Sequence, residues 1–164
     1  MKVRYDMITV FVVRPSADGT SHEFLQMRRA ANDYMGGTWQ IVRGGTNPDE
    51  NMILAALREM REETGLVPTE FYRLGSVESF YTEMDDTLWH AVGCCAFVDR
   101  NAQVQLNEEH EDFRWVPREE MPHRVMWASE RQALTDLCHD ILDNGPGKPV
   151  LKVDLAKWLA RSGI

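Results

Sequence analysis

Runs of β-branched and aromatic residues alternate with short polar stretches along most of the chain, which is the pattern of strands joined by turns. The clearest run, Met-Ile-Thr-Val-Phe-Val-Val, ends at Arg14-Pro15. A polar stretch containing Asp18-Gly19 follows it and predicts a hairpin turn. The pattern predicts strands over residues 7–13, 23–27, 38–42, 71–81 and 87–98, and a last strand that enters the core with Phe113, Trp115 and Val116.

One segment after the third strand shows helical spacing instead. Asn47 is the expected N-cap of this helix, with Pro48 at its first position, and Gly65 is expected to end it. Its apolar residues recur every three or four positions and are expected to face a core: Ile53, Ala56, Leu57 and Met60.

The C-terminal part of the chain predicts a second long helix over residues 127–143, with an apolar face at helical spacing. Residues 144–149, Asn-Gly-Pro-Gly-Lys-Pro, have the composition of a linker, and residues 150–164 are expected to form a small helix. We therefore expect one domain over residues 1–145, followed by a linker and helical tail over residues 146–164.

Length, charge and cysteine content narrow the class of protein. A chain of 164 residues with 43% hydrophobic residues can bury a core as a single domain. The net charge of −8 argues against binding to a nucleic-acid polymer, which normally needs a basic surface. Three cysteines, Cys94, Cys95 and Cys138, form no disulfide or metal-ligand pattern and indicate reduced thiols in a cytoplasmic protein. The first 13 residues resemble neither a signal peptide nor a membrane span.

Three glutamates cluster opposite the apolar stripe of the first helix. Glu59, Glu62 and Glu63 fall on one face of one or two turns. Two carboxylates about 5 Å apart repel by roughly 3 kcal/mol at an effective dielectric constant near 20. A divalent cation would remove this repulsion, and Mg²⁺ prefers carboxylate oxygens together with waters and substrate phosphates. The spacing is therefore typical of a metal site for phosphate chemistry, and a solvated acidic face is the alternative.

The full string around these glutamates is more specific than their spacing. Gly44 is followed after five residues by Glu50, and seven residues later by Arg58-Glu59-Met60-Arg61-Glu62-Glu63-Thr64-Gly65-Leu66. All fixed positions of this string agree with the Nudix box, so the chain resembles a Nudix hydrolase. The resemblance covers roughly residues 5–143. It implies an α/β fold with a mixed sheet between helices, and hydrolysis of a diphosphate linkage in a nucleoside diphosphate derivative.

The resemblance also implies a Mg²⁺ cofactor, with Mn²⁺ as a substitute. Its ligands would be Glu59, Glu62 and Glu63, together with the backbone carbonyl of Arg43, where the family usually has Pro or Gly. The family supplies one more glutamate from outside the box. Glu109 is the choice here and Glu111 the alternative. Glu50 and Arg58 are expected to pair and to orient Glu59. Glu62, Glu63 and Glu109 remain open as acceptors of the proton of the attacking water.

Substrate contacts are expected at the loop before the helix and at two strand ends. Gly44 and Gly45 would approach the phosphates, and the side chain of Arg43 would add a contact. Arg28 would meet a phosphate, the alternative being a solvated strand edge.

Trp89 and His90 raise a second set of alternatives. Trp89 would flank a base-binding pocket, the alternative being an ordinary core position. His90 is a weaker candidate for the general base.

The expected substrate is a small phosphorylated molecule, a nucleotide in the simplest reading. The segments 38–42 and 127–134 are similar to those of Nudix enzymes that act on dihydroneopterin triphosphate or on dinucleoside polyphosphates. No membrane partner is expected, and a homodimer is compatible with the sequence. Two alternatives have different functions: a nucleotide-sensing Nudix module without activity, and an isomerase of the isopentenyl diphosphate type.

Overall fold

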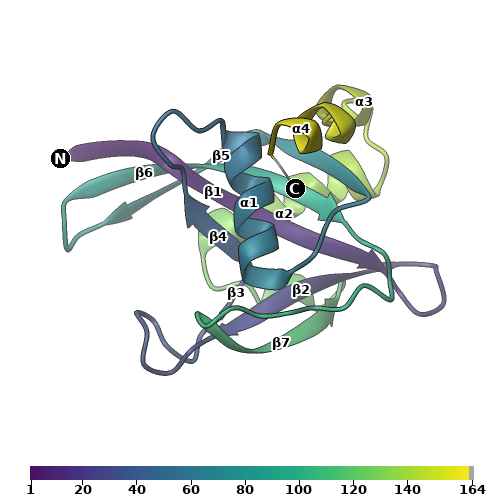
Figure 1. The fold of residues 1–164 in the computed structure, drawn as a ribbon, viewed down its shortest axis with the longest axis horizontal. Helices are drawn as coiled ribbons and strands as arrows, with labels where there is room; N and C mark the ends of the chain where they lie inside the picture. The colour runs from purple at the N-terminus through teal and green to yellow at the C-terminus, as the bar shows by residue number, and fades with distance from the viewer. Residues whose placement is uncertain (163–164) are drawn as a thin grey trace.

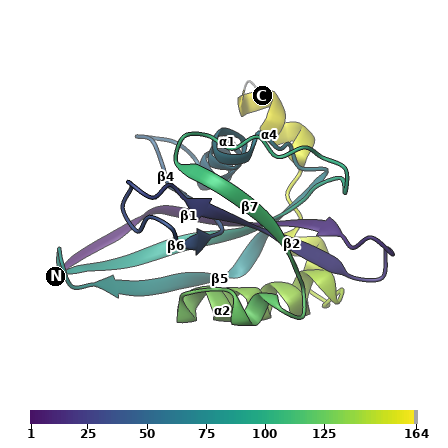
Figure 2. The ribbon, with the colours of Figure 1, turned by 90° about the horizontal axis from the view of Figure 1, so that it is seen from below.

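A mixed seven-stranded sheet lies between two helical layers in the computed structural model, which describes residues 1–162 (Figure 1). Helices α1 and α4 lie on one face of the sheet and α2 on the other (Figure 2). The strands are β1 (Lys2–Pro15), β2 (His22–Arg29), β3 (Trp39–Gln40), β4 (Val42–Gly45), β5 (Glu70–Thr82), β6 (Thr87–Phe97) and β7 (His110–Pro117). The helical segments are α1 (Met52–Thr64), η1 (Met121–His123), α2 (Ala128–Leu137), η2 (Cys138–Leu142), α3 (Lys148–Leu151) and α4 (Leu155–Ser162).

Strand β1 is the centre of the sheet. It pairs antiparallel with β2 and β4 and parallel with β6, and β6 pairs antiparallel with β5. Residues 8–13 of β1 are all buried, because helices cover both faces of the sheet at this point. The expected fold class, α/β with a mixed sheet between helices, is confirmed, as are the two predicted hairpins.

The single strand expected over residues 38–42 is two short strands. β3 pairs with β2, whereas β4 pairs with β1, and Ile41 between them is buried. β1 and β2 pair only at Val13–Pro15, so the two strands separate beyond their hairpin. The chain therefore changes neighbours at Ile41, a tertiary effect that local sequence does not encode.

Helix α1 begins one turn later than its sequence predicts. Asn51, not Asn47, is the N-cap, and its side chain accepts a hydrogen bond from the Ile53 amide at 2.8 Å. Asp49 has a φ of 61°, a left-handed conformation that no helix continues through. Glu50 accepts from the Asn47 amide and lies in a loop before the helix. The expected end is confirmed, since Gly65 adopts a φ of 68°.

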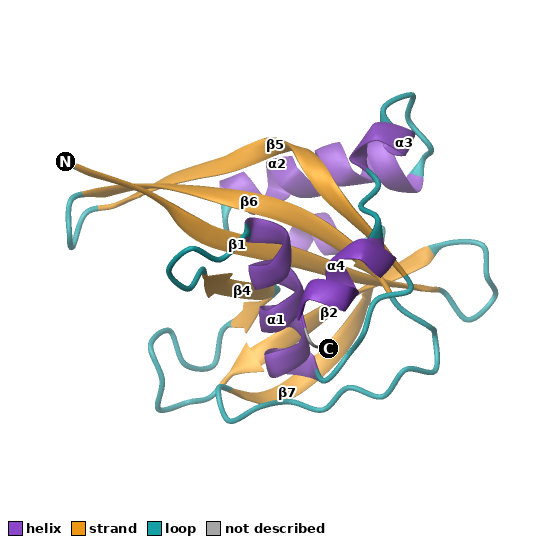
Figure 3. Ribbon diagram, turned by 45° about the horizontal axis from the view of Figure 1, so that its top comes forward, coloured by secondary structure: helices purple, strands orange, loops and turns teal. Residues whose placement is uncertain are grey.

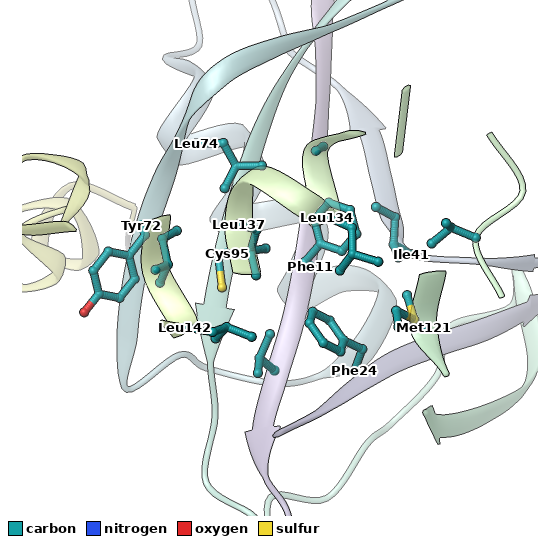
Figure 4. Packing of buried hydrophobic residues seen from close by; sticks show 14 of the residues in the cluster. Phe11, Phe24, Ile41, Tyr72, Leu74, Cys95, Met121, Leu134, Leu137 and Leu142 are labelled. Carbon is teal, nitrogen blue, oxygen red and sulfur yellow. The ribbon is translucent and has the colours of Figure 1, made fainter. Parts of the chain in front are cut away.

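Two apolar cores lie on the two faces of the sheet. Helix α1 covers one core, where Ala56, Leu57 and Met60 are buried as expected and Ile53 packs at the margin. The other core lies under α2 and η2, which together extend nearly as far as the expected helix over residues 127–143. Figure 4 shows Phe11 and Phe24 packing against Leu134 and Met121 in this second core.

Strand β7 differs from its prediction in which residues it buries. Val116 is buried, but Phe113 is exposed and Trp115 is only partly buried. β7 lies outside β2 at the edge of the sheet, so part of it has no helix above it (Figure 3). An aromatic residue in an edge strand is therefore not a reliable marker of the core.

The C-terminal segment packs against the rest of the molecule. Helix α3 begins at Lys148, within the stretch expected to be a linker. Leu151 belongs to the core under α2, whereas Leu155 and Trp158 pack against the core under α1. The Val153 amide donates to the Phe71 carbonyl at 2.9 Å, which ties the segment to the start of β5. The expected small helix is confirmed over Leu155–Ser162, and residues 163–164 lie outside the described residues.

Cys94, Cys95 and Cys138 are free, as expected, and the first two are buried. Within residues 1–162, no helix has the length and apolar composition needed to cross a bilayer.

Candidate active site

Helix α1 presents its three glutamates at three different depths. The Glu62 side chain is 55% exposed, the Glu59 side chain is 15% exposed, and Glu63 is buried at 2%. Residues three and four positions apart lie on the same side of a helix. The glutamates therefore follow one edge of α1 from solvent into the protein.

Arg58 ties this edge to the glycine loop. Its guanidinium donates to both carboxylate oxygens of Glu50 at 2.9 and 2.8 Å, and to the Gly45 carbonyl at 2.9 Å. It also donates to Glu59 at 2.7 Å and to Glu62 at 3.2 Å. The hydrogen bond from Arg58 lowers the pKa of Glu50, and the pKa of Arg58 is raised in turn. The expected Glu50–Arg58 pair is confirmed.

Glu63 lies in an unfavourable environment for negative charge. Burial, with smaller contributions from the charges of Glu59 and Glu109, raises the pKa of Glu63 to about 9. Its Oε2 atom is buried without a hydrogen-bond partner. Burial also raises the pKa of Glu59, against the opposing effect of Arg58. Ionisation of Glu63 is therefore costly, and the described protein groups offset that cost only in part.

Gly44 brings the β4 backbone against the Glu59 carboxyl group. A Cβ atom at this position would lie 2.1 Å from Cδ of Glu59, so no other residue fits without displacing it. The preceding residue, Arg43, faces the other way. Its guanidinium donates to Glu130 of α2 at 2.7 Å, on the opposite side of the sheet. The expected phosphate contact of the Arg43 side chain and the metal contact of its carbonyl stay predictions.

Glu109 approaches the edge of α1 from the loop before β7. Burial is the main cause of the raised pKa of Glu59 and of Glu63, and the charge of Glu109 adds to it. The Glu109 side chain is 46% exposed, and its oxygen lies 3.6 Å from Nη1 of Arg29. Helix α1 and the loop before β7 thus contribute carboxylates that are about 50 positions apart in the chain.

A β-bulge separates Glu109 from Glu111. Arg28 pairs with Asp112 and Arg29 with His110, so Glu111 is the extra residue on β7. Glu111 forms an ion pair with Arg28, with 2.8 Å between its carboxylate oxygen and Nη2 of Arg28. This irregularity before Phe113 directs the two carboxylates to different neighbours.

The other candidates lie on the strands. Arg28 makes its ion pair with Glu111, and its Nε atom is buried without a partner. Trp89 stacks on Phe80, with ring centroids 6.3 Å apart, and its Nε1 donates to Thr82. His90 is hydrogen-bonded to Ser79 at 2.9 Å. None of these contacts joins Trp89 or His90 to the glutamates of α1.

Arg29 is the site residue that the sequence analysis did not assign. Arg29 forms an ion pair with Asp33, with 2.7 Å between nitrogen and oxygen, and a longer one with Glu109. Its positive charge lowers the pKa of Glu63 and so opposes the effect of burial. Successive strand residues face opposite sides of a sheet, so only one of Arg28 and Arg29 could face α1. This alternation indicates that one of the two arginines faces α1, but the sequence alone does not show which one.

A comparison of the chain with known protein families identifies the family to which this site belongs. The model of the NUDIX domain matches residues 6–137, which is most of the chain. The chain belongs to the NUDIX family. The expectation of a NUDIX pyrophosphohydrolase is confirmed at the level of the enzyme class.

Relatives of this NUDIX protein include several nucleotide hydrolases. It is 27% identical over 131 residues to the nucleoside triphosphatase NudI of Klebsiella pneumoniae, covering 76% of this chain and 93% of the relative. It is 30% identical over 111 residues to the asymmetrical bis(5′-nucleosyl)-tetraphosphatase of Mus musculus, covering 65% and 71%. Its fold is similar to that of a C. elegans Ap4A hydrolase in a binary complex, with a TM-score of 0.69 at 21% identity over 86% of this chain and 98% of the other.

The carboxylates of the NUDIX site are ligands of the kind that a divalent cation such as Mg²⁺ prefers. No cluster of three His, Cys, Asp or Glu side chains within residues 1–162 already has the arrangement of a metal site, and Arg58 takes up an oxygen of Glu59. The buried, unpartnered oxygen of Glu63 beside Glu59 nevertheless fits a hard cation, which prefers carboxylate oxygen. The magnesium ion itself stays a prediction.

Proposed function

We propose that this protein is a Mg²⁺-dependent NUDIX hydrolase that cleaves a diphosphate linkage in a nucleoside di- or triphosphate or a related nucleotide derivative. The observation that carries the proposal is the buried Glu63 carboxyl, which has a free oxygen beside Glu59 on an intact box helix. The named activities of the relatives support a nucleotide substrate. Dihydroneopterin triphosphate and dinucleoside polyphosphates are the finer candidates.

In this proposal Glu59, Glu62, Glu63 and Glu109 hold the metal, together with the Arg43 carbonyl. When bound, Mg²⁺ neutralises phosphate charge and lowers the pKa of a water ligand. The protein's own contribution is orientation. Arg58 fixes the position of the Glu59 carboxylate by its direct hydrogen bond and anchors α1 to the loop through Glu50.

Proton transfer from the attacking water needs a free carboxylate within hydrogen-bond reach. Glu62 is engaged by Arg58, whereas Glu109 has only long contacts, 3.6 Å to Arg29 and 3.4 Å to Asn107. Of these two more exposed carboxylates, Glu109 therefore has more freedom to accept the proton, whereas Glu63 is buried. Gly44, Gly45, Arg28 and Trp89 are proposed to contact the substrate.

The deciding experiment measures phosphate and pyrophosphate release from a panel of nucleotides with Mg²⁺, with Mn²⁺ and with excess chelator. Metal-dependent cleavage of at least one nucleotide is expected. Full turnover in chelator would overturn the metal-dependent mechanism. Tight nucleotide binding without cleavage would identify a sensing module, and rearrangement of an allylic diphosphate would identify the isomerase alternative.

A further inference from the structure

Arg43 is the residue through which strand β4 contacts both helical layers, and the mechanism proposed above uses only its backbone. Its guanidinium donates to the Glu130 carboxylate of α2 at 2.7 Å. Its backbone lies beside Glu63 of α1: burial raises the pKa of Glu63, and hydrogen bonding to the Arg43 backbone opposes that rise. One residue therefore joins α2 to a carboxylate of the candidate metal site, across the sheet (Figure 2).

Strand β4 depends on such contacts because it is short and has few strand neighbours. It consists of Val42–Gly45 and, within the described residues, pairs with β1 alone. From the α1 side, Arg58 holds its last residue by donating to the Gly45 carbonyl at 2.9 Å. From the α2 side, Glu130 holds the Arg43 side chain. Each helical layer thus contributes one charged contact that fixes the strand leading into the box.

The Arg43 side chain is enclosed on the α2 side of the sheet. Its guanidinium carbon lies 5.4 Å from the centroid of the Phe80 ring, and its Nη1 atom lies 3.9 Å from Sδ of Met7. The Arg43 side chain is 23% exposed and that of Glu130 is 6% exposed, so the ion pair lies largely out of solvent. The guanidinium is therefore held away from the glutamates of α1.

Stability alone does not account for an ion pair at this depth. Moving two charges out of water is costly, and apolar side chains of similar volume often stabilise a fold as much or more. An arginine–carboxylate pair adds a defined geometry, because the planar guanidinium directs its N–H groups along fixed lines. The pair of Arg43 with Glu130 is therefore better explained by the position that it imposes on β4.

Glu130 has a second contact that must be separated from this one. It is the third residue of α2. Burial raises its pKa, and hydrogen bonding to the backbone of Trp127, the N-cap residue, is among the effects that oppose this rise. A glutamate or glutamine at the third position caps the start of a helix in this way. Glutamine would keep the cap but lose the charge that holds Arg43, so Glu130→Gln separates the two roles.

We propose that Glu130 is a positioning residue for the metal site. By holding the Arg43 side chain on the α2 side, it keeps the β4 backbone in place beside Glu63. The Arg43 side chain serves this contact rather than a substrate phosphate. The inference rests on the proposed function for the metal that Glu63 and the Arg43 carbonyl would bind, whereas the link between Glu130 and β4 needs no metal.

The first experiment tests this link without metal or substrate. Amide hydrogen exchange in chelator is followed by mass spectrometry for the unmodified protein and for Glu130→Gln. Peptides that contain β4 should exchange roughly tenfold faster in the variant, as expected when a hydrogen bond between charged groups is lost, while peptides from β6 and β7 keep their rates. Glu120→Gln makes the same chemical change in an exposed ion pair with Arg124 and should alter no rate.

Two results of this experiment would overturn the proposal. Unchanged exchange of β4 in Glu130→Gln would show that the ion pair does not hold the strand. Faster exchange of all strands together would show that Glu130 stabilises the whole fold and has no particular effect on β4. Thermal melts of each variant report the global stability against which the local change is compared.

The second experiment measures binding of Mg²⁺ and Mn²⁺ by calorimetric titration in the absence of substrate. Glu130→Gln should weaken metal binding roughly ten- to a hundredfold, the usual effect of losing a group that orients a metal ligand. Because Glu130 acts through Arg43, Arg43→Gln should have a similar effect, and the double variant should bind no more weakly than either single variant. Additive losses in the double variant, or an unchanged affinity in Glu130→Gln, would contradict the proposal.

Kinetics of the same variants separate positioning from a phosphate contact. If Arg43 bound a substrate phosphate, Arg43→Gln alone would raise KM for the nucleotide, whereas Glu130→Gln would free the guanidinium and leave KM unchanged or lower. That pattern would overturn the proposal. Failure of the proposed function is recognised differently, because the unmodified protein then cleaves no nucleotide. The exchange experiment in chelator still decides whether Glu130 positions β4, since it depends on neither metal nor turnover.

Discussion

At the scale of single residues, the site is organised by differences in burial among chemically identical glutamates. Glu62 is in solvent and Glu63 is in the protein interior, although they are adjacent in the sequence. Burial makes ionisation of Glu63 costly and keeps its pKa near 9. A cation that binds beside it would offset that cost, so the same residue that destabilises the empty fold would drive metal binding.

Glu63→Gln tests this trade between stability and activity. We expect kcat to fall by orders of magnitude, because the variant loses a charged ligand, while the fold holds or gains stability. The folded-state pKa of about 9 lies above the ordinary value of 4.5. In chelator the free energy of unfolding of the unmodified protein should therefore fall as the pH rises from about 4.5 to about 9, by on the order of a few kcal/mol. Denaturant titrations at several pH values should show a weaker fall for the variant, and a near-normal rate would place the metal elsewhere.

Glu109 and Glu111 form a matched pair for a second test at this scale. The bulge on β7 turns Glu109 toward Glu59 and Glu63 and leaves Glu111 with Arg28. Glu109→Ala should lose a large part of kcat with a modest change in KM. Glu111→Ala should stay within about 0.5 kcal/mol in stability and change the rate little. Kinetics at saturating Mg²⁺ decide it: a dead Glu111→Ala would reverse the assignment, and two active variants would limit the site to the box.

At the scale of elements, the sequence predicted α1 and the hairpins well, but not where segments change partners. Hydrophobic spacing and the glycine at position 65 are local signals, and both were reliable for α1. The split of residues 38–42 into β3 and β4 depends on the separation of β1 from β2, which no local pattern contains. The position of Arg29 beside Glu109 and the pairing of Arg43 with Glu130 were not predicted for the same reason, since they depend on which face each strand presents.

The start of α1 offers a prediction about capping at this scale. Asn47 is the N-cap that the sequence predicts, yet Asn51 is the residue that accepts from the helix, at the Ile53 amide. Asn51→Ala should therefore cost about 1 kcal/mol of unfolding free energy, as is usual for a lost N-cap. Asn47→Ala should cost much less, because only its backbone amide bonds to Glu50. Chemical denaturation of the two variants compares them directly, and a larger loss at Asn47 would contradict the observed helix start.

At the scale of the whole molecule, the sheet separates two apolar cores, and the C-terminal segment packs against both of them. The α1 side carries the glutamates of the box, and the α2 side carries the ion pair of Arg43 with Glu130. The segment from Lys148 to the end of α4 reaches both sides, since Leu151 packs under α2 and Trp158 against the α1 core. The boundary expected at residue 145 remains a prediction about an independent folding unit, and this packing allows it to be tested.

Leu151 and Val150 are neighbours with opposite environments, which makes them a test of how far the tail supports the fold. Leu151 is 8% exposed and belongs to the core under α2, whereas Val150 is 74% exposed. If the tail is part of the cooperative fold, Leu151→Ala should lower the unfolding free energy by about 2–4 kcal/mol, the cost of a buried cavity. Val150→Ala should stay within about 0.5 kcal/mol. Equal, small effects of both substitutions in denaturant titrations would mean that the tail detaches before the core unfolds, which is the behaviour of a separate segment after residue 145.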